Sequence, residues 1–150
     1  MDQEKRKHHL LIGGTGRAGT TFLVQLLTVL GLDTGYTPQE ALDGVDRYSN
    51  AGLEHRLADE NLPYVVKSPW LADEVEDALR AGILVADAAI IPMRNLFDAA
   101  ESRRAVYREA QQRGVDPLQQ PGTLWKTREP EQQELHLANQ FYRFLYPLVQ

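Results

Sequence analysis

Three glycines within a short stretch are the first residues whose spacing suggests chemistry. Gly14, Gly16 and Gly19 follow an apolar segment and are followed by the hydroxyl side chains of Thr20 and Thr21. Glycines let the backbone wrap closely around an anion, and the free N–H groups at the start of a helix attract negative charge. The loop therefore predicts a site for a phosphate-like group.

Two general nucleotide-binding patterns share this spacing, and the sequence departs from both. Gly14, Gly16 and Gly19 have the spacing of a dinucleotide fingerprint, and Gly14 with Gly19 and two threonines is close to a Walker A loop. A Walker A loop has lysine where Thr20 stands, and a dinucleotide fold needs an acid after its second strand, whereas Asp33 comes too early. A P-loop nucleotide kinase and an NAD(P)-binding module are kept as alternatives.

Polar side chains also follow the two later apolar segments. Lys67 comes after the segment 63–66, and Arg94 comes after the segment 87–93, with Ser102 eight residues further on. The carboxyl ends of parallel strands meet at one edge of a sheet, so we expect these side chains to lie near the glycine loop. Arg94 and Ser102 are placed to hold one phosphate, the arginine through two parallel hydrogen bonds.

Both motifs resemble those of one enzyme family. Residues 14–21 resemble the 5′-phosphosulfate loop of the sulfotransferases that use PAPS (3′-phosphoadenosine 5′-phosphosulfate). Residues 94–102 resemble the family's second signature, although Leu96 stands where proline is usual. The resemblance runs from about His9 to Arg104, and the family's C-terminal nucleotide-covering loop has no counterpart. It implies cofactor contacts from Gly14, Thr15, Gly16, Arg17, Ala18, Gly19, Thr20, Thr21, Arg94 and Ser102.

The resemblance also implies a reaction and roles in it. PAPS would be the co-substrate, and its sulfuryl group would pass to a hydroxyl or amine of a small-molecule acceptor without a metal. Arg17 and Lys67 would stabilise the phosphosulfate. Glu40 is the candidate base, because some members use a glutamate about two dozen residues beyond the loop. His55 is the alternative base, since a free histidine pKa of about 6.5 suits proton transfer.

Strand-like and helix-like segments alternate around these residues, which predicts an α/β fold with a small, mainly parallel sheet. We expect one domain over residues 1–150, with the loop-bearing strand in the centre; the resemblance implies a three-layer α/β/α P-loop-type fold.

The chain ends on a predicted helix. We therefore expect it to be the first part of a larger unit, a truncated non-catalytic domain, or a chain whose sheet is completed by a second copy in a homo-oligomer or by a partner chain. Arg103, Arg104 and Arg108 are expected on a solvent-facing helix surface, with a phosphate contact from the first of them as the alternative. The predicted strands are 8–12, 63–66 and 87–93, and the predicted helices are 20–30, 38–42, 53–59, 70–81, 95–113 and 131–146.

Composition excludes several classes of protein. The 150 residues carry 16 basic and 21 acidic side chains, a net charge of −5, which argues against a dedicated nucleic-acid binder. The absence of cysteine rules out disulfides, cysteine-ligated zinc and thiol catalysis. His8 and His9 lack a third ligand at useful spacing, so no metal is expected. A polar start and the lack of a long apolar run predict a cytoplasmic protein without a membrane span.

Overall fold

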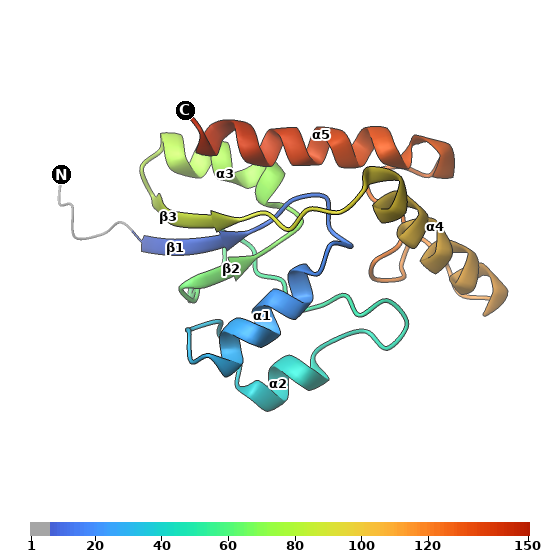
Figure 1. Ribbon diagram of the computed structural model, residues 1–150, viewed down its shortest axis with the longest axis horizontal. Helices are drawn as coiled ribbons and strands as arrows, with labels where there is room; N and C mark the ends of the chain where they lie inside the picture. The colour runs from blue at the N-terminus through green and yellow to red at the C-terminus, as the bar shows by residue number, and fades with distance from the viewer. Residues whose placement is uncertain (1–6) are drawn as a thin grey trace.

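The computed structural model describes residues 7–150 and contains a three-stranded parallel sheet with helices around it (Figure 1). The strand order is β2-β1-β3, so the strand that leads into the glycine loop lies in the centre, as the sequence predicts. Leu10 pairs with Val65 on one side and with Ala88 on the other. The elements are β1 (Lys7–Ile12), α1 (Thr20–Val29), α2 (Pro38–Asp43), β2 (Val65–Lys67), α3 (Leu71–Arg80), β3 (Leu84–Ile90), α4 (Leu96–Gln112), α5 (Gln133–Leu145) and the 3₁₀ turns η2 (Pro130–Gln132) and η3 (Tyr146–Leu148).

Apolar side chains cover both faces of the sheet. Successive strand residues point to opposite faces, so Leu11 packs toward α3 and Phe144 of α5, whereas Ile12 packs toward α1 and α2 through Val24 and Ala41. Figure 1 shows the same division, with α3 and α5 on one side of the strands and α1 and α2 on the other. Burial on both faces explains why the strands are nearly continuous runs of apolar residues.

Three predicted elements differ from the structure. The second strand is β2 at Val65–Lys67 rather than 63–66, so Lys67 is the last residue of the strand. The third strand is β3 at residues 84–90, three residues earlier than predicted, because pairing with β1 ends level with Ile12. Arg94 therefore follows a loop rather than the strand itself. The predicted helix at 53–59 is wrong: Leu53 has a left-handed φ of 64°, and the His55 N–H donates to the Lys67 carbonyl at the end of β2.

The helix starts depend on local side chains. Asn95 caps α4, its Oδ1 accepting from the Asp98 N–H at 3.2 Å. α3 begins at Leu71, and ahead of it Ser68 Oγ accepts from the Trp70 N–H at 3.1 Å. Among the residues described, no helix is both long and apolar enough to cross a membrane. Residues 1–6, on which part of the argument against a signal peptide rests, lie outside the described residues.

Candidate functional site

A cavity of about 910 Å³ lies at the carboxyl ends of β1 and β2. This volume is at the upper end of the range for small-molecule sites, about 300–1,000 Å³. The lining comes from the glycine loop, the segment 44–54, the residues 67–70 at the end of β2, and the late loop 118–125. Arg103 of α4 and Gln140 of α5 complete the wall. Segments far apart in sequence thus meet around one space.

The glycine loop leads into a helix whose first turn is open. Gly19 is the N-cap of α1 with a left-handed φ of 92°, no side chain caps the helix, and its first turn holds no acid. The positive end of α1 is therefore unopposed by side chains. Gly16 has a left-handed φ of 70°, and a Cβ there would lie 2.6 Å from Arg103 Nη2, so the arginine side chain would have to shift. The glycine lets the loop approach this arginine.

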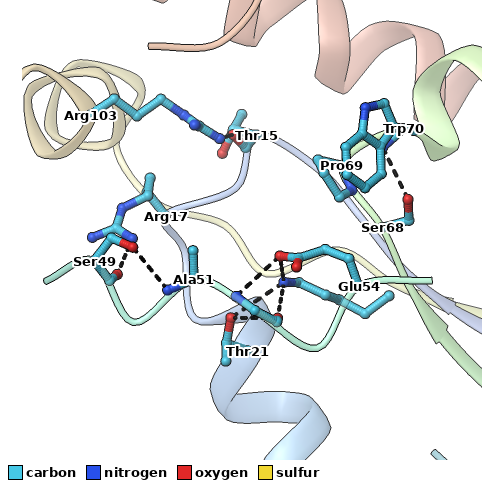
Figure 2. A network of polar contacts seen from close by, with 12 residues as sticks. Thr15, Arg17, Thr21, Ser49, Ala51, Glu54, Ser68, Pro69, Trp70 and Arg103 are labelled. Carbon is cyan, nitrogen blue, oxygen red and sulfur yellow. Dashed lines mark hydrogen bonds and ion pairs between the residues drawn. The ribbon is translucent and has the colours of Figure 1, made fainter. Parts of the chain in front are cut away.

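Lys67 is buried at the base of the cavity and uses all three of its N–H donors. Its Nζ lies 2.5 Å from Glu54 Oε1, 2.7 Å from the Gly52 carbonyl oxygen and 3.3 Å from Thr21 Oγ1 (Figure 2). Burial lowers the Lys67 pKa, and the ion pair with Glu54 only partly offsets that effect. The predicted lysine thus faces the cavity together with a glutamate that sequence reasoning missed.

Arg17 connects the glycine loop to two other segments. Its Nε donates to Ser102 Oγ at 3.0 Å, and its Nη1 donates to the Ser49 carbonyl oxygen. Arg94 donates to the Arg17 carbonyl oxygen at 3.1 Å. The structure therefore brings Arg17, Arg94 and Ser102 together, but Arg94 and Ser102 stand beside Arg17 and do not line the cavity.

Arg103 is the largest departure from the expected solvent-facing arginines. Arg103 is only 5% exposed, and its side chain extends from α4 toward Thr15 (Figure 2). Nη1 donates to the Thr123 carbonyl oxygen at 2.7 Å and Nη2 to that of Thr15 at 3.4 Å. Burial, and next the charge of Arg17, lower the pKa of Arg103 to about 9, so its guanidinium remains charged at neutral pH. Arg104 and Arg108, in contrast, form ion pairs with glutamates.

Positive charge in the cavity is incompletely balanced. Glu54 pairs with Lys67, and Asp46 accepts hydrogen bonds from Ser49, Tyr48 and Gln120, none of which is charged. These bonds outweigh the effect of burial and lower the Asp46 pKa. Within residues 7–150, Arg17, Arg94 and Arg103 form no ion pair. The arrangement provides unpaired cations for an anion at the glycine loop.

The two bases predicted from the sequence lie elsewhere. Glu40 is fully exposed at the start of α2, where it forms a capping box with Thr37; hydrogen bonds from Thr37 lower the Glu40 pKa. His55 stacks on Tyr36, with 5.2 Å between ring centroids, and its Nε2 lies 3.1 Å from the Thr34 carbonyl oxygen. Neither residue lines the cavity, whereas Glu54 does.

No protein-family model, curated protein or solved structure matches this chain. Among residues 7–150, no group of three histidine, aspartate or glutamate side chains is arranged to hold a metal ion. The functional argument therefore rests on the geometry of the cavity itself.

Proposed function

We propose that this chain is a PAPS-dependent sulfotransferase with a three-layer α/β/α P-loop-type fold. The observation that carries the proposal is the meeting of three features at one cavity: a glycine loop, the uncapped start of α1, and two arginines, Arg17 and Arg103, that form no ion pair within residues 7–150. Burial and the charge of Arg94 lower the Arg17 pKa, and the charge of Arg17 contributes to lowering that of Arg103. An anionic ligand would relieve this repulsion and satisfy the open helix end.

PAPS carries two separate anionic groups, the 5′-phosphosulfate and the 3′-phosphate. The cationic side chains of the site form two sets, and we assign one set to each group. We assign the 5′-phosphosulfate to the first turn of α1, Lys67 and Arg103, which line the cavity. We assign the 3′-phosphate to Arg94 and Ser102, which contact Arg17 and do not line the cavity. Arg17 would then contact or bridge both groups. An ADP-like ligand would use only the first set of contacts.

Glu54 is the base in this proposal, in place of Glu40. The acceptor O–H or N–H gives its proton to Glu54, and the acceptor atom forms a bond to sulfur. The bond between sulfur and the bridging oxygen breaks, and its electron pair leaves with 3′-phosphoadenosine 5′-phosphate (PAP). Lys67 stabilises the charge on that oxygen. Its longest contact, 3.3 Å to Thr21 Oγ1, is the one that bound phosphosulfate would most readily replace.

Calorimetric titration with PAP, ADP, ATP with Mg²⁺, and NAD tests the proposal directly. We expect tight binding of PAP and much weaker binding of the other three. Preference for ATP with Mg²⁺ would indicate a kinase, and preference for NAD would indicate a dinucleotide-binding module. PAP binding without sulfuryl transfer to any acceptor would indicate a non-catalytic nucleotide-binding domain. Failure of all four ligands to bind would refute the proposal.

A further inference from the structure

The helix α1 carries apolar side chains on its outward face as well as on its inward face. On the inward side, Leu23, Val24 and Leu27 pack in the core beneath the sheet. On the outward side, four large apolar side chains are 40–67% exposed: Phe22, Leu26, Val29 and Leu30. A helix that is apolar all round is normally buried on every side, so the outward face indicates a surface that another molecule covers.

The four exposed side chains form one strip along the helix. Successive residues are turned by about 100° around a helix axis, so positions 22, 26, 29 and 30 fall within an arc of about 100°. This is the width that a surface helix usually turns toward its own core. The strip on α1 therefore has the spacing of a helix-packing face.

The charge around the strip favours a protein over a lipid surface as its partner. No charged side chain occurs in residues 18–32, and no lysine or arginine occurs between Arg17 and Arg47. The neighbouring α2 exposes the carboxylates of Glu40 and Asp43. Helices that lie on a membrane carry lysine and arginine on their polar face, so this composition disfavours lipid. A lack of charge at the centre of a patch is typical of protein interfaces.

The area of the strip fits a contact between two copies of this chain. With these exposed fractions, the four side chains present on the order of 400 Å² of apolar surface, similar to the largest apolar patches on single proteins. Two copies would bury on the order of 800 Å² from these residues alone, and a polar rim would bring the contact to the roughly 1,000 Å² of a specific interface. An uncharged apolar strip is complementary to itself, so a two-fold contact brings no like charges together at its centre.

We propose that the outward face of α1, formed by Phe22, Leu26, Val29 and Leu30, is the contact surface of a homodimer. This contact uses a helix face and differs from the completion of the sheet by a second copy. Because Phe22 also lines the cavity, the second copy would lie beside it. Dimerisation through this face does not require any particular ligand in the cavity.

Sedimentation velocity of the whole chain measures the association directly. We expect a concentration-dependent shift from the 17.0-kDa monomer to twice that mass in the micromolar range. Val29→Lys places a charge in the strip and should raise the dimer Kd at least about tenfold. A lysine near the C-terminal end of α1 suits the helix dipole, so the Tm should not fall. Leu135→Lys is the matched control: Leu135 of α5 is 70% exposed and Val29 is 67% exposed, and the dimer Kd should stay unchanged.

Cross-linking gives a second measurement, because the chain contains no cysteine. The two-fold axis of a symmetric contact would pass near the middle of the strip, at Leu26. Leu26→Cys and Leu135→Cys are each treated with a short bismaleimide, which joins two thiols only when they lie close together. We expect cross-linked dimers from Leu26→Cys and few from Leu135→Cys. Equal yields from the two variants would indicate random collision and contradict the assignment.

The other occupants of the strip give different results. A chain that stays monomeric throughout the micromolar range would overturn the inference. A dimer that Leu135→Lys dissociates and Val29→Lys does not would also overturn it, because its contact would lie on α5. Flotation with vesicles of phosphatidylcholine and phosphatidylserine tests a lipid surface. A monomer that binds these vesicles, and loses the binding in Val29→Lys, would assign the strip to lipid and overturn the dimer.

Discussion

Replacing Arg103 by methionine tests whether its buried charge serves a ligand or the fold. The side chain keeps a similar length, but the guanidinium is removed from a position that is 5% exposed. Burial, and next the charge of Arg17, lower the pKa of Arg103 to about 9, well below its ordinary value. At about 1.4 kcal/mol per pKa unit, the charged form costs on the order of 5 kcal/mol in the folded protein. Its two hydrogen bonds to carbonyl oxygens, at about 1.5–3 kcal/mol each, offset that cost. The two effects nearly cancel.

We therefore expect Arg103→Met to change the free energy of unfolding by no more than about 2 kcal/mol in either direction. Affinity for PAP, unlike stability, should fall clearly. Loss of one charged hydrogen-bonding partner removes about 1.5–3 kcal/mol of binding free energy, which weakens the Kd about ten- to a hundredfold. Denaturant unfolding of the free protein and calorimetry with PAP measure the two quantities separately. Arg108→Met, on the exposed side of the same helix, is the control and should leave both unchanged or nearly so.

A purely structural arginine would give the opposite pattern. Arg103→Met would then lower the free energy of unfolding by several kcal/mol, and the folded fraction would bind PAP with its original Kd. That result would refute the assignment of Arg103 to the anion site. It would also remove the main support for placing the phosphosulfate at the glycine loop.

Three further predictions test other parts of the site. Arg94→Ala should weaken PAP binding by about 1.5–3 kcal/mol and leave ADP binding nearly unchanged in calorimetry, because ADP lacks a 3′-phosphate; equal losses for the two ligands would contradict the assignment. Glu54→Gln should lower turnover about 10²–10⁴-fold in a sulfuryl-transfer assay with PAP affinity maintained, while Glu40→Gln, at an exposed helix cap, should retain normal turnover. Near pH 9, PAP binding should be accompanied by proton uptake, because an anion raises the lowered pKa values of Arg103 and Lys67 toward their ordinary values. Calorimetry in two buffers of different ionisation enthalpy measures the uptake, and proton release would show that the anion does not contact these cations.

The sequence predicts best those elements whose local signals are strong. Glycines next to a helical apolar pattern define the loop and α1, and the position of β1 follows from the alternation of strands and helices. The sequence places the third strand three residues late because residues 84–86 and 91–93 are both apolar. Only pairing with β1, which ends at Ile12, selects between them. The register, that is, which residues of two strands pair, depends on the partner strand, so it cannot be read from the composition of one segment.

The candidate base is harder to predict for a related reason. Glu40 and Glu54 both lie in the irregular segment 32–62, and their types and surroundings in sequence are similar. The path of that segment depends on a left-handed backbone at Asn50 and Leu53 and on the bond from the His55 N–H to the Lys67 carbonyl oxygen. These tertiary features turn Glu54 toward Lys67. No short motif encodes them.

The burial of Arg103, in contrast, can be predicted from the helical spacing of its neighbours in the sequence. Residues 99, 103, 106 and 110 recur at helical spacing, and all four are buried in α4. Arg103 therefore occupies the inward face of the helix between small and apolar neighbours. A charged residue on an inward face needs a partner, and its known contacts here are two carbonyl oxygens. The helical pattern alone indicates a special role at this position.

The short run from Lys67 to Trp70 connects the anion site to a pair of aromatic side chains. Lys67 contacts Glu54 at the anion site, and Trp70 lies beside Trp125, which also lines the cavity. Three residues of chain span at most about 11 Å, so the backbone positions of Lys67 and Trp70 cannot be further apart than this. Gln140 holds the same run through the Pro69 carbonyl oxygen. A sulfuryl donor at Lys67 and an acceptor beside Trp70 would thus be held by one anchored segment, which is the proximity that direct group transfer requires.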